Sequence, residues 1–368
     1  MSQHRFVFIG TYTEAILFGT GQIVQGKGRG IHIYRFDTAS GALEPYGLAE
    51  GIRNPSYLAI HPSRRYLYAV NELKEFEGQT CVAISAFALD PESGRLSFIN
   101  QRATHGTDPC HLSVAQTGEC VLVANFASGS ACVLPIRPDG SLGDATDVVQ
   151  HHGFSIDPRR QAGPHAHAVT LDNRGRYVFV PDLGLDKVMI YELDAARGAL
   201  KPHTTPWVEV RPGAGPRQLV MHPGGRFAYL INELNSTMMA FRYDGDRGTL
   251  EEIQTLSTLP DGFDGKSSCA EVQISPVGDL LYGSNSGHDS LVIYAVDQAE
   301  GTLTRIGHVS TRGKTPRNFA VDPDGNWVLV ANQDSDNIAV FRVDHGTGGL
   351  VAAGATTSVP MPVCVKVL

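Results

Sequence analysis

The feature that most constrains this fold is an internal repeat of about 50 residues. Each copy holds an apolar run, usually led by proline, then a turn and a second apolar run, as in PSYLAIHPSRRYLYAVNE. Turns such as His-Pro, Asp-Asn-Arg-Gly and Asp-Pro-Asp-Gly are typical of hairpins, so each copy predicts two antiparallel strands. The six copies begin at residues 55, 109, 164, 216, 269 and 316.

Two further strands follow each hairpin. The third is an alternating run that ends near an acidic residue, as in KVMIYELD, and a Gly-x-Leu signal then opens the fourth. This signal occurs seven times, at Gly41, Gly94, Gly140, Gly198, Gly248, Gly301 and Gly348. Seven four-stranded units therefore fit the chain.

The seventh hairpin is divided between the two ends of the sequence. PVCVKVL, from Pro362, matches the first strand of the unit, and HRFVFIGTYT, from His4, matches the second. Pairing these strands would close a ring and protect its free edges. We therefore predict an all-β protein, a single seven-bladed β-propeller domain over residues 1–368. An open solenoid would need distinct caps instead of complementary half-blades.

The composition agrees with this prediction and narrows the partners. Charged residues are only 18%, with 40 Gly and 21 Pro, which favours short strands and tight turns. A net charge of −8 without a basic run indicates no nucleic-acid partner. Without a signal-peptide pattern or a long apolar stretch, we expect no membrane association and a cytoplasmic location. The six scattered cysteines are expected to be buried and reduced.

One end of the ring is expected to carry the chemistry. In a four-stranded blade, the loop leading into the innermost strand and the loop joining strands two and three lie at the same end. Polar residues from these loops should converge around the central axis. The candidates are His111, His165, His167, Asp182, Arg217, Glu233, Glu271, Arg317 and Gln333. Among them we expect His111, Asp182, Glu271 and Gln333 to bind substrate.

The two arginines indicate an anionic ligand. A buried arginine is costly unless it is paired, and its planar fork suits a carboxylate or a phosphate. Arg217 and Arg317 would alternatively pair with a loop acid such as Glu233 or Glu271. Beside an arginine, Glu233 can stay ionised and accept a proton from water, which makes it a candidate general base. The alternative is that Glu233 serves only as an arginine partner.

The segment RRQAGPHAHAV offers two histidines. His165 and His167 would face the same side of a strand, because side chains alternate along it, and histidine exchanges protons near pH 7. They could also be a polar lining that hydrogen-bonds to loop carbonyls. A zinc site would need His151 or His152 as a third ligand. We favour the acid–base interpretation and predict no metal.

Two segments are longer than the repeat requires. Residues 14–30 interrupt the divided blade and are rich in glycine, so we expect a mobile cover over the mouth of the ring. Residues 144–163 lead into the blade that begins at Pro164, on the same face. Two long loops at one mouth fit a ligand site better than a flat scaffold.

Many motifs resemble one known family. GTYTE, RQAGPHAHAV, GAGPRQLVMHP, NELNSTM, CAEVQISP and TPRNFAVDPDGNWVLVANQD are similar to the blade motifs of the seven-bladed lactonase family. That family groups propeller-type 6-phosphogluconolactonases with fungal-type 3-carboxy-cis,cis-muconate cyclases. The resemblance covers essentially the whole chain.

The resemblance implies an active site without a metal or an organic cofactor. The muconate cyclases of the family use a histidine, two arginines and a glutamate. By motif, the arginines fall on Arg217 in GPRQ and Arg317 in TPRN, and the glutamate falls on Glu233 in NEL. The histidine falls on the PHAH segment, as either His165 or His167.

These observations predict an enzyme that hydrolyses a sugar-acid lactone, with 6-phosphoglucono-1,5-lactone as the leading substrate. Arg217 and Arg317 would bind the phosphate or the developing oxyanion. Glu233 or a histidine of PHAH would activate water, and the other would protonate the ring oxygen. The alternatives are a lactonising cyclase that acts on a carboxylated muconate, and a non-catalytic propeller that binds a small anion or a protein. No feature of the sequence indicates the oligomeric state.

Overall fold

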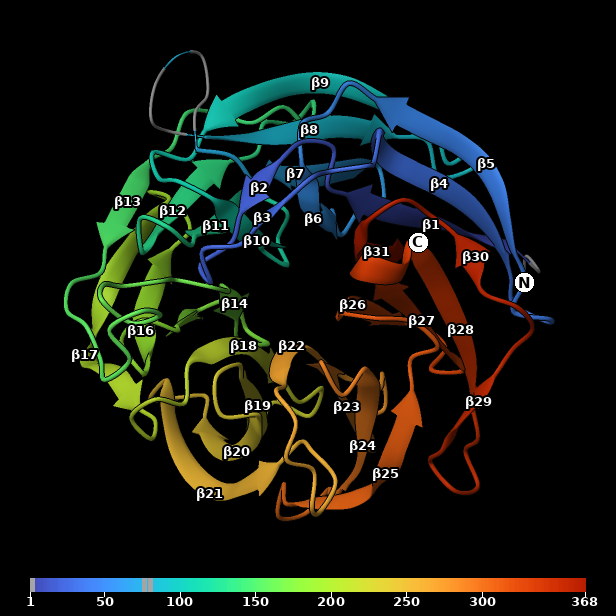
Figure 1. The fold of residues 1–368 in the computed structure, drawn as a ribbon. Helices are drawn as coiled ribbons and strands as arrows, with labels where there is room; N and C mark the ends of the chain where they lie inside the picture. Colours follow the sequence, from blue (N-terminus) through green and yellow to red (C-terminus); the bar gives the residue numbers. More distant parts are fainter. Residues whose placement is uncertain (1–3, 75–77, 79–81) are drawn as a thin grey trace.

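A computed structural model of the protein describes residues 4–74, 78 and 82–368. Seven large β-sheets stand around a central axis like the blades of a propeller (Figure 1). Within the described residues, the one helical segment is a short 3₁₀ turn, η1 (Gln333–Ser335). The predicted all-β, seven-bladed propeller is confirmed.

Each blade is an antiparallel meander whose strands follow one another from the axis outward. Blade 1 holds β6 (Pro55–Ile60), β7 (Tyr66–Asn71), β8 (Ala83–Leu89) and β9 (Leu96–Ala103). Blade 2 holds β10 (Pro109–Val114), β11 (Cys120–Asn125), β12 (Ser130–Pro135) and β13 (Asp147–Gln150). Blade 3 holds β14 (Thr170–Leu171), β15 (Tyr177–Asp182), β16 (Lys187–Asp194) and β17 (Ala199–Glu209).

The second half of the ring continues in the same order. Blade 4 holds β18 (Pro216–Met221), β19 (Phe227–Asn232), β20 (Thr237–Asp244) and β21 (Thr249–Ser257). Blade 5 holds β22 (Ser268–Ile274), β23 (Leu280–Ser286), β24 (Ser290–Val296) and β25 (Leu303–Ser310). Blade 6 holds β26 (Pro316–Val321), β27 (Trp327–Asn332), β28 (Asn337–Val343) and β29 (Leu350–Ala352), and β30 (Thr357–Ser358) also pairs with β28.

Blade 7 closes the ring as predicted. Its innermost strand is β31 (Pro362–Val367), followed outward by β1 (His4–Thr11), β4 (Gly30–Asp37) and β5 (Leu43–Glu50). β31 and β1 pair antiparallel, with Val365 opposite Ile9. The first and the last strand of the described chain therefore lie in one sheet (Figure 1).

The core lies between neighbouring blades. Val7 and Ile9 of β1, for example, pack with Leu329 of β27 and Val365 of β31. Such contacts arise because alternating strands present one apolar face to each neighbouring sheet. The thiols of the described residues are free and buried; these are Cys110, Cys120, Cys132, Cys269 and Cys364. Cys81 lies outside the described residues.

The innermost strand of blade 3 departs from the prediction. It was expected to begin at Pro164, but β14 comprises only Thr170–Leu171, and Ala166 forms an isolated bridge to Asp182. The reason is a side chain: the Asp182 carboxylate accepts a hydrogen bond from the His165 backbone nitrogen at 2.7 Å. The expectation that His165 and His167 lie on one regular strand that begins at Pro164 is therefore wrong.

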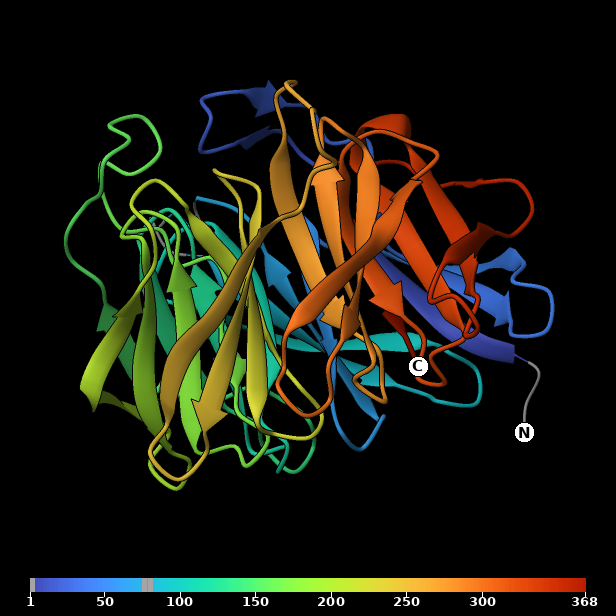
Figure 2. The same cartoon turned by 90° about the horizontal axis from the view of Figure 1, so that it is seen from below.

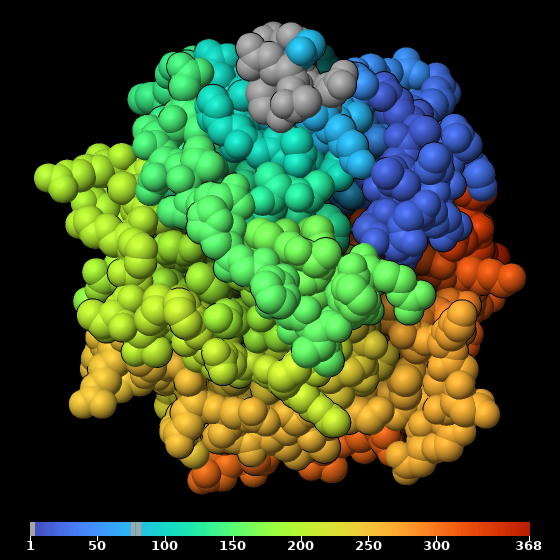
Figure 3. Space-filling model, turned by 60° about the vertical axis from the view of Figure 1, so that its left-hand side comes forward, coloured from blue at the N-terminus to red at the C-terminus, as the bar shows by residue number. Residues whose placement is uncertain are grey.

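Two insertions rise from one face of the ring. One is a small hairpin formed by β2 (Ile16–Leu17) and β3 (Ile23–Val24), and the other comprises residues 151–163 (Figure 2). They meet near the axis, where Gly19 of the hairpin lies beside Phe126 and Arg160. Figure 3 shows the two segments side by side on the surface. Among the described residues, none lies in a helix long and apolar enough to cross a membrane.

Candidate active site

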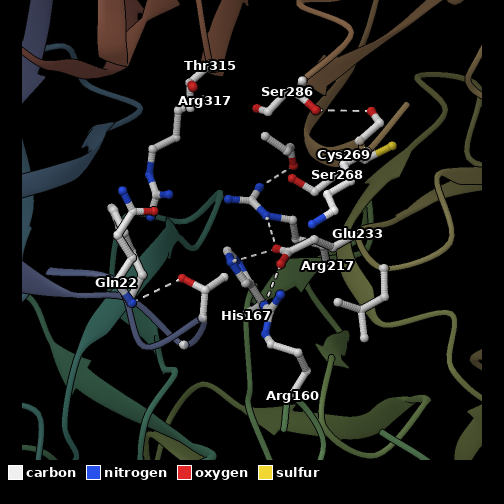
Figure 4. Close-up of a pocket in the computed structure, with 18 of the residues that line it drawn as sticks. Gln22, Arg160, His167, Arg217, Glu233, Ser268, Cys269, Ser286, Thr315 and Arg317 are labelled. Carbon is white, nitrogen blue, oxygen red and sulfur yellow. Dashed lines mark hydrogen bonds and ion pairs between the residues drawn. The ribbon is translucent and has the colours of Figure 1, made fainter. Parts of the chain in front are cut away.

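A cavity of about 850 Å³ opens beneath the two insertions. The β2–β3 hairpin, the loops leading into the innermost strands, and residues 265–268 supply its walls. Of the predicted site residues, the structure brings five to this cavity. His167, Arg217, Glu233 and Arg317 are labelled in Figure 4, and Gln333 is the fifth.

Glu233 lies at the centre of the charged groups. One carboxylate oxygen accepts a hydrogen bond from Arg217 Nε at 3.0 Å, and the other accepts one from Arg160 Nη2 at 2.5 Å. The position is fixed because the backbone nitrogen of Glu233 donates to the carbonyl oxygen of Gly215. Burial raises the pKa of Glu233, but the charges of Arg160 and Arg217 outweigh it and hold the pKa below its usual value. Glu233 is therefore ionised at neutral pH.

Arg217 is largely occupied by protein groups. Besides its bond to Glu233, its Nη1 donates to the carbonyl oxygen of Ala270. The predicted alternative in which Arg217 pairs with Glu233 is therefore observed. Since the side chain is only 7% exposed, it forms a rigid wall of the cavity and fixes the Glu233 carboxylate.

Arg317 is more available to a ligand. Its Nη2 lies 3.7 Å from the nearest Glu72 oxygen, and its side chain is 21% exposed. The guanidinium lies against the rings of Tyr12 and Phe18, at 5.4 and 5.0 Å from their centroids. The Tyr12 hydroxyl in turn donates to Glu72 at 2.9 Å. Arg317 is thus held in place without a short carboxylate bond, so its fork can meet an anion.

His167 also faces the Glu233 carboxylate, as Arg160 and Arg217 do. Its Nε2 lies 4.0 Å from Glu233 Oε2, and the Cys110 thiol donates to its backbone carbonyl at 3.2 Å. Burial lowers the pKa of His167 well below its usual value, and the charges of Arg217 and Arg317 lower it further. The imidazole is therefore neutral at pH 7 and can accept a proton.

His165 lies outside the cavity lining. Its ring stacks on Phe126 at 4.6 Å with an interplanar angle of 14°, and its Nδ1 lies 3.1 Å from the Phe126 carbonyl oxygen. The structure therefore separates the two histidines that the sequence left as equal candidates. His165 makes the contacts of a polar lining, whereas His167 faces the charged groups.

Asp182 also lies away from the cavity. Its buried carboxylate accepts hydrogen bonds from the backbone nitrogens of His165 and Gly184, and lies 2.6 Å from Nδ1 of His151. These contacts fix the loops around β15. In the described part of the chain, no group of three or more His, Cys, Asp or Glu side chains is arranged to hold a metal ion.

His111 and Glu271 lie deeper on the axis. They line an enclosed pocket of about 20 Å³, which shares Arg217, Arg317 and His167 with the larger cavity. This is roughly the space of one water molecule. Burial lowers the pKa of His111, so its ring is neutral.

Amide side chains surround Glu271 in this lower pocket. Gln218, Gln273 and Asn318 donate to its carboxylate at 2.9, 3.1 and 2.6 Å. These bonds satisfy the buried carboxylate of Glu271. Together with His111, Glu271 lines the lower pocket and forms the floor of the site. Gln333 lies at the upper level, where its amide donates to Asp334.

Sequence reasoning missed Arg160 and Asp108, which both line the cavity. Glu72 also lines it; the sequence placed Glu72 in a loop at this end of the ring but gave it no role. A signal existed for Arg160 and for Glu72. Arg160 belongs to the long segment that was expected at this face. Glu72 lies in an Asn-Glu-Leu triplet that recurs at Glu233, in the equivalent loop of blade 4.

The fold and the cavity together define a seven-bladed propeller with an axial site for a small molecule. The sequence model described as "Lactonase, 7-bladed beta-propeller" matches residues 6–367. The chain belongs to this lactonase family, as the blade motifs predicted.

Relatives of similar length carry lactonase names. The 6-phosphogluconolactonase of Bacillus subtilis is 35% identical over 98% of this chain and 97% of its own. That of Formosa agariphila is 32% identical over 94% of both chains. Among solved structures, the periplasmic gluconolactonase of Pseudomonas aeruginosa superposes with a TM-score of 0.91, at 37% identity and 99% coverage of both chains.

Proposed function

We propose that this protein hydrolyses a sugar-acid lactone, with 6-phosphoglucono-1,5-lactone as its substrate. The observation that carries the proposal is the Glu233 carboxylate, held between Arg160 and Arg217 beside the neutral imidazole of His167. The names of the B. subtilis and F. agariphila relatives support the choice of substrate.

The geometry favours His167 as the group that activates water. A neutral imidazole has a free nitrogen that accepts a proton, whereas both Glu233 oxygens already accept hydrogen bonds from arginines. In the proposed reaction, water attacks the carbonyl carbon of the lactone and its proton passes to His167. Glu233 stabilises the imidazolium that results, across the 4.0 Å that separates the two groups.

Arg317 is proposed to bind the negative charge of the substrate. Its loose contact with Glu72 leaves donors for either the phosphate or the oxygen that becomes negative in the tetrahedral intermediate. Arg217 lies across the cavity from Arg317 but is committed to Glu233 and Ala270 (Figure 4). The small anionic lactone is thus expected to lie between the two arginines.

Direct assay tests the proposal. Purified protein is mixed with freshly prepared 6-phosphoglucono-1,5-lactone, and acid release is followed against the spontaneous rate. Parallel assays with unphosphorylated glucono-1,5-lactone and with 3-carboxy-cis,cis-muconate separate the phospholactonase from a gluconolactonase and from a cyclase. We expect the highest kcat/KM with the phosphorylated lactone. A rate equal to the spontaneous one overturns the proposal.

The proposed compartment is the cytoplasm. Free, buried cysteines among the described residues support it, since disulfides are rare in reducing compartments. Because the P. aeruginosa relative is named as periplasmic, the location needs its own measurement. Fractionation of the native host should recover the protein with cytoplasmic markers, and recovery with periplasmic markers would contradict the proposal.

A further inference from the structure

One carboxyl group in the cavity has no part in the arrangement above. Asp108 lies between β9 and β10, lines the cavity and is only 7% exposed. Four other carboxylates line the cavity, and each accepts a hydrogen bond: Glu72, Asp157, Glu233 and Asp334. Among the residues that the structure describes, none makes a hydrogen bond or an ion pair with the Asp108 carboxyl.

The backbone of Asp108 is fixed from both sides. Its nitrogen donates to the carbonyl oxygen of Leu73 in blade 1, and its carbonyl accepts from the nitrogen of Phe126 in blade 2, both at 2.9 Å. The residue has a φ of +50°, a conformation that is costly for residues other than glycine and that persists where the surroundings impose it. The two bonds therefore hold an unpaired carboxyl at the cavity wall.

A buried carboxyl without a partner favours its neutral form, because charge is costly away from water. Among the described residues, three titratable groups interact electrostatically with it: Glu72 and Lys74 on the loop after β7, and Cys110 at the start of β10. Burial raises the pKa of Asp108 to about 7, the charge of Glu72 also raises it, and Lys74 opposes them. A sizeable fraction of this carboxyl therefore carries a proton at neutral pH.

Lactone hydrolysis needs such a proton. When the bond between the carbonyl carbon and the ring oxygen breaks, the electron pair goes to the ring oxygen, which then takes up a proton to become a hydroxyl. Neither resting group of the proposed mechanism supplies it, because Glu233 is ionised and His167 is neutral. Asp108 lines the same cavity and can donate.

We propose that Asp108 is a further catalytic residue, the general acid that protonates the ring oxygen of the lactone as it leaves. The proposal rests on the proposed lactonase function. The water proton passes to His167, the Asp108 proton passes to the ring oxygen, and the carboxyl carbon keeps the oxygen from water. Asp108 then regains a proton from solvent, His167 releases its own, and the product leaves as a carboxylate.

Asp108→Asn tests this role on 6-phosphoglucono-1,5-lactone. We expect kcat to fall by about 100-fold with KM changed little, since general acids contribute in that range. Wild-type kcat should fall as pH rises through about 7, the pKa of Asp108, and the variant should lack this decline. Asp264→Asn is the matched control, because this exposed carboxyl lies outside the cavity lining, in the loop between β21 and β22.

Thermal stability separates catalysis from a structural role. The pKa of Asp108 is raised in the folded state. The stability that its protonated carboxyl contributes is therefore fully present at low pH and is lost as pH rises through about 7. Asp108→Asn should therefore raise Tm at pH 8 while it lowers kcat. A structural Asp108 would instead give a lower Tm.

Each outcome is decisive. A wild type that does not hydrolyse the lactone overturns both proposals. An active wild type with an Asp108→Asn variant within twofold of it overturns only the role of Asp108. If the variant does not fold, the wild-type pH profile decides, and a kcat that stays constant from about pH 6 to about pH 9 overturns the role.

Discussion

Arg160 and Glu233 are separated by 73 positions in the sequence and form an ion pair of 2.5 Å in the cavity wall. Arg160 comes from the 151–163 insertion, and Glu233 comes from the loop after β19. The insertion therefore supplies a charged group to the site in addition to covering it. Its turn is fixed locally, because the Asp157 carboxylate accepts from the backbone nitrogens of Arg159 and Arg160.

Removal of this ion pair should change the acid side of the pH profile. In Arg160→Ala, burial is opposed only by the charges of Arg217 and Arg317, so the depressed pKa of Glu233 rises. Because a depressed pKa keeps the carboxylate ionised down to low pH, activity should now be lost at a higher pH than in the wild type. We expect a drop in kcat/KM of about tenfold at pH 7. Arg159→Ala, an exposed neighbour, should leave the profile unchanged.

The two histidines should respond unequally to substitution. His167→Ala removes the proposed base and should lower kcat by about 100-fold or more. His165→Ala removes a ring stacked on Phe126 outside the cavity lining, so it should mainly lower Tm. Steady-state kinetics and thermal unfolding of both variants make the comparison. Equal losses of kcat would contradict the assignment.

Arg317 should discriminate between phosphorylated and unphosphorylated lactones. Charge-assisted hydrogen bonds contribute about 1.5–3 kcal/mol, so loss of the guanidinium should raise KM for the phosphorylated lactone by about ten- to 100-fold. If Arg317 binds the phosphate, Arg317→Ala leaves KM for glucono-1,5-lactone nearly constant. A fall in kcat for both lactones would place Arg317 at the oxyanion instead.

Asp182 should matter for stability. Its carboxylate is buried and holds two backbone nitrogens and His151, so Asp182→Ala leaves these groups without a partner. We expect the free energy of unfolding to fall by about 3 kcal/mol. Asp144→Ala, at an 87% exposed side chain, should change it little. Urea unfolding of the two variants measures the difference, and equal stability would show that Asp182 has no structural role.

The repeat predicted much of this molecule because each copy places equivalent residues at equivalent points of the ring. Arg217 and Arg317 each follow the proline that begins an innermost strand, so both were assigned to the axis from sequence alone. The same repeat also assigned Glu233 to the axis, because Glu233 lies in the loop that joins the second and third strands of its unit. Pairing of β31 with β1 followed from the divided hairpin.

The failures lie where the chain leaves the repeat. His165 and Asp182 were misplaced because the Asp182 carboxylate bonds to the backbone nitrogen of His165, and strand periodicity does not describe such a bond. Arg160 was missed because the course of a long insertion is set by its tertiary contacts. Asp108 was missed because its significance is the absence of a partner among the described residues, which only a three-dimensional structure shows.

The pairing of β31 with β1 also orders events during synthesis. β1 leaves the ribosome early, yet its inner partner follows every other strand in the chain. Until β31 arrives, the hydrogen-bonding groups along the inner edge of β1 have no strand to meet. Val363, which lines the lower pocket, is also still missing. The lower pocket of the nascent protein is therefore complete only after β31 has closed the ring.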